Sequence, residues 1–210
     1  MKERNITVTL DKAKEWFNSG NATLKEIALQ AFDKDELAYN FKNITTFKKA
    51  CEALNLDYMS CLINANNIAT ISKASAAMFE LNIIRKALNL GQDLHLTKPK
   101  DRYIYYPYNP FVTKSSTCYK NVINSYKMEV IGKIKSEGEE YNVLGGHASN
   151  GSANLGDFGS RSGVGYADTN IGFLGCANKE IAQHFGKYFG MLITEAKYGD
   201  MVDFEIISEY

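Results

Sequence analysis

Residues that could carry out chemistry are few in this sequence of 210 residues, and they are widely spaced. A zinc site needs clustered ligands, but the histidines stand apart at His95, His147 and His184, and no H-E-x-x-H or C-x-x-C pattern occurs. The turn at Gly163-Val164-Gly165 does not complete the G-x-G-x-x-G pattern of dinucleotide sites. We therefore expect neither a metal ion nor a cofactor.

A nucleophile activated by a histidine is the remaining catalytic arrangement. The segment 159–163 is close to G-x-S-x-G, but its central residue is Arg161, so we interpret it as a turn. His147 could serve a small hydrolase only if it lay in a pocket, within hydrogen-bond reach of a nucleophile. The candidate nucleophiles are Ser149, Ser152 and Cys176. Because Cys176 ends an apolar segment, an inert buried thiol is the favoured interpretation, and we expect no enzyme.

The most unusual segment is 145–170, which is rich in Gly, Ser, Asn and Ala. We expect it to be a long polar loop, and ordered loops of this length are usually functional. A solvent-facing spacer is an alternative of equal weight. If the loop binds a ligand, its polar and ionisable side chains are the candidate contacts: His147, Asn150, Ser152, Asn154, Asp157, Arg161, Tyr166 and Asp168.

The first hundred residues predict helices that would hold this loop in place. Apolar residues recur at helical spacing behind a Thr9 cap, behind a Thr23–Glu26 capping box, and behind Thr45 or Thr46. The strongest helix is expected over residues 72–90, where two apolar stripes predict burial on most sides and Gly91 would cap the end.

The rest of the chain predicts strands and one late helix. Tyr103–Phe111, with prolines and many aromatic residues, suits an extended edge segment, and we expect its rings to be mostly buried. A helix should begin after Asn178, and its Gly186 and Gly190, four residues apart, should allow another element to approach closely. Further strands are expected over residues 128–135, 141–144, 171–176 and 201–206.

Glycine usage divides the chain near residue 100. Two glycines precede residue 103 and fourteen follow from Gly132 onward. We therefore predict an α+β protein in which a helical part, residues 1–97, packs with a β-rich part, residues 103–210, across a linker that contains Pro99.

Charge and hydropathy exclude several classes of protein. The 24 basic residues balance the 24 acidic residues, which argues against a nucleic-acid binder or a protein that binds anionic membranes. No apolar run is long enough to span a membrane, and no secretory signal is visible. We therefore expect free thiols, although a Cys118–Cys176 disulfide stays open.

Two segments resemble a known family. Gly145-Gly146-His147-Ala148, followed by a polar stretch and then Asn170-Ile171-Gly172-Phe173, resembles C-type-lectin-like proteins related to formylglycine-generating enzymes. In that family G-G-S-W, a variable stretch and N-I-G-F-R close the fold, and the stretch binds ligands in phage and bacterial members. This chain differs at His147, Ala148 and Leu174, and a helix follows. The resemblance implies framework roles for Gly145, Gly146, Ile171, Gly172 and Phe173.

A second resemblance covers more of the chain. Residues 6–17, 21–25 and 46–51 are similar to the N-terminal helices of uncharacterised Bacteroidales phage and prophage proteins, and residues 77–81, 105–108 and 184–189 fit the same group. This resemblance implies a phage origin and a role at the particle surface.

Together these observations predict a non-enzymatic phage structural or adhesion protein, such as a capsid or tail decoration or a fibre component. Its expected partners are other virion proteins or further copies of itself, in a homo-oligomer, together with a surface glycan or a host protein. It would be assembled in the host cytoplasm and carried in the virion. The alternatives are an intracellular phage or host factor that binds a protein or small molecule, for example in counter-defence, and the hydrolase that uses His147.

Overall fold

The structure is a computed structural model that describes residues 7–90, 103–113, 123–124, 127–152 and 174–209. It divides into two compact units, residues 1–40 and residues 41–210. The sequence analysis expected a boundary between residues 97 and 103, so the observed division comes earlier in the chain. The difference arises because the helices between residues 47 and 69 pack on the helix over residues 73–88, which in turn packs on the helix over residues 179–198, and glycine content does not report such long-range packing.

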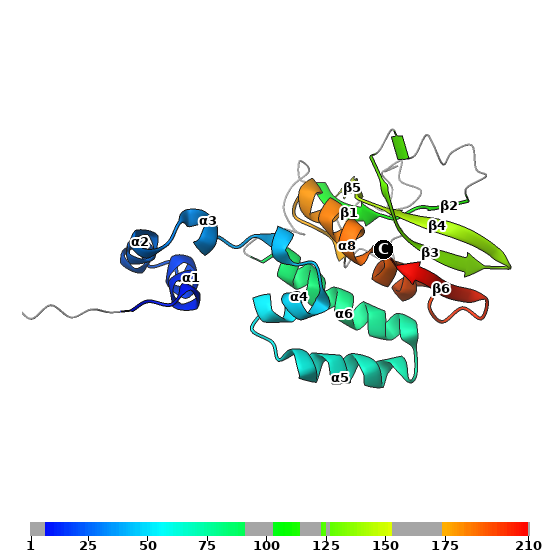
Figure 1. The fold of residues 1–210 in the computed structure, drawn as a ribbon, viewed down its shortest axis with the longest axis horizontal. Helices are drawn as coiled ribbons and strands as arrows, with labels where there is room; N and C mark the ends of the chain where they lie inside the picture. The colour runs from blue at the N-terminus through cyan, green and yellow to red at the C-terminus, as the bar shows by residue number, and fades with distance from the viewer. Residues whose placement is uncertain (1–6, 91–102, 114–122, 125–126, 153–173, 210) are drawn as a thin grey trace, which may run out of the picture. The chain divides into compact units, whose positions relative to one another are not determined.

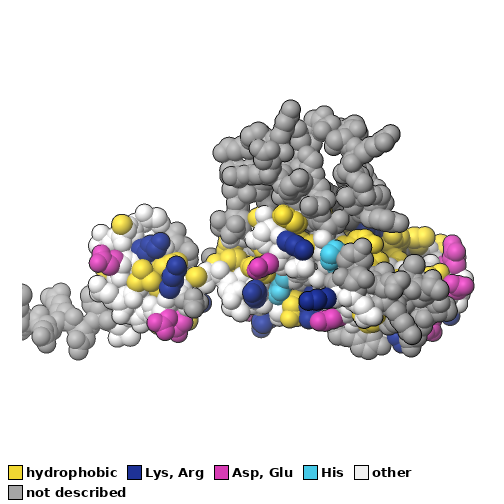
Figure 2. Space-filling model, turned by 90° about the horizontal axis from the view of Figure 1, so that it is seen from above, with side chains coloured by type: hydrophobic (Ala, Val, Ile, Leu, Met, Phe, Trp, Pro, Cys, Tyr) yellow, Lys and Arg dark blue, Asp and Glu magenta, His cyan; other side chains and the backbone are white. Residues whose placement is uncertain are grey.

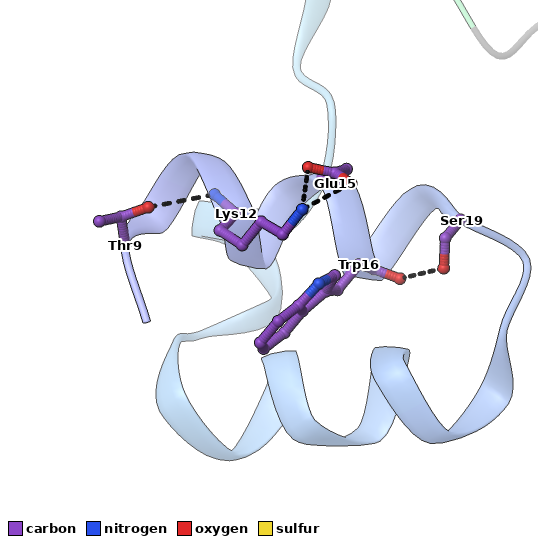
Figure 3. Close-up of polar contacts among 5 residues, drawn as sticks. All are labelled: Thr9, Lys12, Glu15, Trp16 and Ser19. Carbon is purple, nitrogen blue, oxygen red and sulfur yellow. Dashed lines mark hydrogen bonds and ion pairs between the residues drawn. The ribbon is translucent and has the colours of Figure 1, made fainter. Parts of the chain in front are cut away.

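The first unit contains helices α1 (Leu10–Asn18), α2 (Ala22–Ala31) and α3 (Lys34–Leu37). The predicted cap of α1 is confirmed: the Thr9 hydroxyl accepts a hydrogen bond from the backbone N–H of Lys12 (Figure 3). The small core of this unit consists of Ala13, Ala28 and Leu37, with Trp16 packed against it. Small side chains at the centre allow these short helices to approach one another closely.

The start of α2 corrects one predicted cap. The side chain of Asn21, and not that of Thr23, accepts hydrogen bonds from the first turn, at 3.0 Å from the N–H of Thr23 and 3.2 Å from that of Leu24. Because α2 begins at Ala22, Thr23 already lies within the helix. Gly20, with φ of 75°, forms the turn that precedes the cap.

The second unit begins with the 3-10 turn η1 (Phe41–Asn43) and the helices α4 (Phe47–Ala53), α5 (Tyr58–Ala69) and α6 (Lys73–Leu88). Thr46 caps α4, as predicted, and Ser72, which was expected to begin the helix over residues 72–90, caps α6. Helix α5 was not predicted, because asparagines interrupt its apolar stripe; the Asp57 carboxylate caps it at 2.8 Å from the Ser60 N–H. Helix α6 ends at Leu88, with Asn89 as its C-cap, and the predicted cap Gly91 lies outside the described residues.

Helix α8 (Lys179–Tyr198) lies between α6 and the strands, and contacts both (Figure 1). The predicted cap is confirmed, because the Asn178 side chain accepts from the Ile181 N–H at 2.9 Å. The predicted close approach at its glycines is also confirmed: Gly186 and Gly190 lie against Asn109. A helix that is covered on two sides in this way needs buried residues on both, and Ile181, Ala182, Phe185, Gly186, Phe189, Gly190, Met191, Ile193 and Thr194 are buried.

Six strands lie in the described residues: β1 (Tyr103–Tyr108), β2 (Phe111–Val112), β3 (Glu129–Ser136), β4 (Glu139–Gly145), β5 (His147–Ser152) and β6 (Phe204–Glu209). An antiparallel sheet has the order β2-β4-β3-β6, and β1 pairs separately with β5. Ile131, Ile134 and Val143 of the sheet form a buried cluster with Met191 of α8. The α+β class predicted from the sequence is thus confirmed.

Most of the predicted strands are found. The segments 128–135 and 141–144 contain β3 and β4, and the extended segment Tyr103–Phe111 contains β1. The last strand begins at Phe204, a little later than expected. The strand predicted over residues 171–176 is not found in its described part: at residues 174–176 the structure has only an isolated bridge between Cys176 and Tyr105.

The predicted loop over residues 145–170 also needs correction in its first part. His147–Ser152 form β5, which pairs in register with the whole of β1, from Tyr108↔His147 to Tyr103↔Ser152. Pairing satisfies the backbone groups of these small polar residues, which alone would have a low strand propensity. Gly146, with φ of 93°, allows the chain to turn from β4 into β5.

Candidate functional site

The eight predicted ligand-binding residues fall in two groups. His147, Asn150 and Ser152 lie on β5, where their backbones are opposite Tyr108, Tyr105 and Tyr103 of β1. The other predicted contacts lie outside the described residues: Asn154, Asp157, Arg161, Tyr166 and Asp168. The structure therefore brings the first three to one strand beside an aromatic strand, and the ligand site as a whole stays a prediction.

His147 is half-buried at the start of β5. Its ring meets the Tyr108 ring edge to face, with centroids 6.0 Å apart. Burial, together with the positive charge of Lys179, lowers the pKa of His147 below its usual value of 6.5. The imidazole is therefore neutral at pH 7, and one of its nitrogens can accept a hydrogen bond.

Cys176 is not placed as the nucleophile of a His147 hydrolase. Its backbone N–H and C=O both bond to Tyr105, on the edge of β1 that faces away from β5, so that β1 separates it from His147. Cys176 is fully buried, and burial raises its pKa to about 12. A thiol with that pKa stays protonated and unreactive at neutral pH. The described geometry therefore supports the inert buried thiol and not the Cys–His pair.

A pocket that the sequence analysis missed lies where η1 meets the first turns of α8. Its volume is about 360 Å³ and it is open to solvent. In its lining, Nε2 of His184 is 2.8 Å from the backbone oxygen of Ile44, and because a carbonyl oxygen can only accept, Nε2 carries the proton. The lining residues are Phe41, Lys42, Glu180, Gln183, His184, Lys187 and Tyr188.

Aromatic rings surround His184 in this pocket. The Phe41 ring approaches edge-on at 5.5 Å, and the Tyr188 ring lies at 4.5 Å, between centroids. Burial, outweighing the Ile44 hydrogen bond, lowers the pKa of His184, and nearby Lys42 and Lys187 lower it further. The pocket thus combines a neutral imidazole with aromatic faces and with charges of both signs, which suits a small polar ligand.

The Lys187 ammonium closes one side of the pocket. Its Nζ is 2.7 Å from a Glu129 carboxylate oxygen of β3 and 5.9 Å from the Tyr188 ring centre. Figure 2 shows basic, acidic and histidine side chains close together on one face of this unit. The only sequence signal for this site was the spacing of His184 and Tyr188, four residues apart on a predicted helix. The hydrogen-bond partner of His184, Ile44, is 140 positions away.

The outer face of α5 is a surface feature that the sequence did not predict. Met59 and Ile63, one helical turn apart, are 56% and 55% exposed. No charged residue occurs from Tyr58 to Ser72, and several asparagines share the exposed side. Helix α5 packs on α4 and α6 and forms the outermost helical layer of the unit in Figure 1. An exposed helix without charges is unusual for a solvated surface, and it is typical of a contact surface.

Apolar side chains are also exposed at the corner where α5 turns into α6. The Ser72 hydroxyl donates to the Asp200 carboxylate, which also accepts from the Ala74 N–H at 3.2 Å. This contact brings the α5–α6 turn beside the turn that follows α8. Ile71 is 90% exposed and Val202 is 99% exposed, so apolar side chains lie on both turns of this corner.

Within the described ranges, no three His, Cys, Asp or Glu side chains are grouped so that they could hold a metal ion. No helix in the part of the chain that the structure describes is long and apolar enough to cross a membrane. Comparison with protein-family models, with curated proteins and with solved structures finds no match. The resemblances to lectin-like and phage families therefore stay predictions.

Proposed function

We propose that this chain is a non-enzymatic structural or adhesion protein of a phage particle, which binds further copies of itself and acts by surface recognition. The observation that carries the proposal is the uncharged, exposed outer face of α5. The resemblance of the N-terminal helices to phage proteins supports the setting. In this proposal the helices fasten the chain to its neighbours, and the segment that begins with β5 presents polar groups to a glycan or host protein.

The α5 face suits a second copy of the same chain. Two copies related by a twofold axis bring identical surfaces together, and a surface without charges then causes no like-charge repulsion. Burying the remaining exposed area of Met59 or Ile63 would stabilise the dimer by about 1 kcal/mol for each side chain. The exposed amides of Asn64, Asn66 and Asn67, further along the helix, can pair across the axis as donors and acceptors.

Light scattering after size exclusion tests this proposal on the full chain. We expect the wild-type protein to have at least twice the 23.5 kDa mass of one chain. Ile63→Lys should reduce the mass to that of one chain, because a dimer would bury two ammonium groups against each other. Leu29→Lys is the matched control: Leu29 is 43% exposed on α2, and this substitution should leave the oligomer intact.

Two results of the light-scattering experiment would contradict the proposed α5 contact. A wild-type protein that stays monomeric over the accessible concentration range would overturn the α5 contact. Equal loss of assembly in Ile63→Lys and Leu29→Lys would also contradict it, because the contact would then not be specific to α5. Circular dichroism of both variants checks that they remain helical.

The phage setting needs its own test, since an oligomer could occur in many settings. Mass spectrometry of purified particles should detect this chain at a fixed ratio to the major capsid protein. Its complete absence from the particles would leave the assembly contact standing but would refute the virion role.

A second candidate function is favoured by the His184 pocket: a factor that binds a small molecule or a protein inside the host cell. The pocket volume of about 360 Å³ lies at the low end for small-ligand sites. A screen of small polar aromatic fragments by NMR should then shift resonances of Tyr188 and Gln183, and Tyr188→Ala should abolish those shifts. This function does not require an oligomer, so the fragment screen tests it separately from the light-scattering experiment.

A further inference from the structure

The His184 pocket is built from one face of α8 and one turn. The lining residues that α8 contributes are spaced three or four positions apart, so they share one face of the helix. They are Glu180, Gln183, His184, Lys187 and Tyr188. The 3-10 turn η1 contributes Phe41 and Lys42. Both elements belong to the second unit.

The order of these side chains along α8 separates groups of opposite charge. Glu180 is in the first turn of the helix, and Lys187 follows about two turns and so about 10 Å further on. Between them, Nε2 of His184 donates to Ile44, so Nδ1 carries a lone pair that can accept a hydrogen bond. A ligand that lies along this face therefore meets an acid, then hydrogen-bonding groups, and then a base.

The ionised groups around the pocket balance one another. Lys42 and Lys187 carry positive charges, and Glu180 carries a negative charge. Glu129 supplies a further negative charge, 2.7 Å from the Lys187 Nζ. His184 adds no charge at neutral pH, because burial lowers its pKa. A ligand with a net charge would disturb this balance, whereas a ligand with one charge of each sign would preserve it.

We propose that this pocket binds a short zwitterionic peptide with free ends, whose ammonium lies beside Glu180 and whose carboxylate lies beside Lys42 and Lys187. This inference rests on the second candidate function, a small-ligand site at His184, and names its ligand class. Two extended residues span about 7 Å, and a hydrogen bond of about 3 Å at each end lets them bridge groups that are separated along α8. The peptide N–H can donate to Nδ1 of His184, and an aromatic side chain can pack on the exposed Tyr188 ring.

Titration of the isotope-labelled full chain, followed by NMR, tests this ligand class with three matched dipeptides. The first is glycyl-phenylalanine. Its N-acetyl derivative lacks the ammonium, and its C-terminal amide lacks the carboxylate. Glycyl-phenylalanine should shift the amide resonances of Gln183 and Tyr188. It should bind about two- to fivefold more tightly than either blocked peptide, which is the effect of one solvent-exposed ion pair.

Single substitutions test which group recognises each end of the peptide. Glu180→Gln should remove the advantage of glycyl-phenylalanine over the acetyl peptide and keep its advantage over the amide. Lys42→Met should reduce the advantage over the amide and keep the advantage over the acetyl peptide. Both residues are exposed, so neither change disturbs a core. Glu205→Gln, at an exposed position of β6, is the matched control and should leave all three affinities unchanged.

The peptide assignment can fail without the pocket failing. Blocked peptides that bind as tightly as glycyl-phenylalanine would overturn it, and so would an unchanged advantage over the acetyl peptide in Glu180→Gln. If aromatic fragments shift Gln183 and Tyr188 but no dipeptide does, the small-ligand function stands and the peptide proposal is wrong. If neither fragments nor dipeptides shift these resonances, both are refuted.

Discussion

Asn109 and Asn89 each connect segments that lie far apart in the sequence. Nδ2 of Asn109 donates to the backbone oxygens of Leu144 and Gly186, at 2.9 and 2.8 Å. The side-chain oxygen of Asn89 accepts from the Ala177 N–H at 2.8 Å. At the scale of single residues, these amides fix how α8, the strands and the end of α6 fit together. Each side-chain amide supplies a hydrogen-bond partner to backbone groups that would otherwise be buried without one.

Replacing Asn109 by alanine should lower the free energy of unfolding by about 2–4 kcal/mol, because two carbonyl oxygens lose their donor in a part-buried place. Urea unfolding of the full chain, followed by circular dichroism, measures the loss. Asn82→Ala is the matched control: its amide bonds only to the Met78 oxygen of its own exposed helix turn. Equal losses in the two variants would contradict the connecting role of Asn109.

His184 should make stability depend on pH. Its pKa is lowered in the folded state, so the unfolded chain takes up a proton near pH 6.5 while the folded chain resists until lower pH. The stabilisation is therefore complete above pH 6.5 and is lost as the pH falls from there through the folded pKa. We expect the urea midpoint of the wild-type protein to fall between about pH 7.5 and about pH 5.

The variant His184→Gln should show a smaller fall in the midpoint, because glutamine can still donate to Ile44 but does not titrate. His147, whose pKa is lowered in the same direction, contributes separately, and the double variant should be flatter still. An unchanged pH dependence in His184→Gln would show that burial of this imidazole does not control it.

At the scale of elements, helix α8 determines how the second unit is assembled. It contacts α6, β1, β3, β4 and β5, so helices and strands share it as a common partner. Gly186 and Gly190 explain how the strands can pack so close to α8. The Gly186 oxygen accepts from Asn109, and a side chain in place of either glycine would meet that residue. Glycine lowers the helix propensity of α8, and the close packing of α8 against Asn109 and the strands offsets that cost.

Gly190→Ala should destabilise the protein more than Gly186→Ala. A methyl group at residue 190 would overlap the side chains of Ile131 and Asn109, whereas at residue 186 the nearest atom is the Pro107 Cβ at 3.1 Å. Overpacking costs about 1–3 kcal/mol, and alanine returns about 1 kcal/mol of helix propensity. Gly186→Ala should thus be near neutral and Gly190→Ala clearly destabilising, as compared by thermal unfolding. The reverse order would contradict the packing described for α8.

At the scale of the whole molecule, the two units have separate cores. Ala13, Ala28 and Leu37 form one of them, and the cluster of Ile131, Ile134, Val143 and Met191 belongs to the other. No residue is shared between these clusters. Each unit thus satisfies the main requirement for folding by itself, which is a hydrophobic core of its own.

A protein consisting of residues 41–210 should therefore fold without the first unit. We expect its thermal midpoint to lie within a few degrees of that of the full chain, and its amide NMR spectrum to overlay for residues of α6 and α8. A collapsed spectrum, or a midpoint far below that of the full chain, would show that the first forty residues stabilise the second unit.

Local signals predicted the fold better than long-range ones did. Caps such as Thr9, Ser72 and Asn178 lie next to the apolar stripes they begin, so the helices behind them could be predicted. Helix α5 and strand β5 could not, because their polar residues are ordered by neighbours elsewhere in the chain. The His184 pocket depends on contacts of His184 with Ile44 and Phe41, and no pattern in the sequence predicts contacts between residues so far apart.

The position of α8 in the chain has a consequence for biosynthesis. The ribosome makes α6 and strands β1–β5 before it makes the helix that covers them. Until then the nascent chain must carry uncovered apolar surfaces, including those of Ile131, Ile134 and Val143, which pack with Met191 of α8. Such surfaces are what chaperones bind and what drives aggregation during translation. Production of soluble protein should accordingly improve when synthesis is slowed by cooling or when chaperones are abundant.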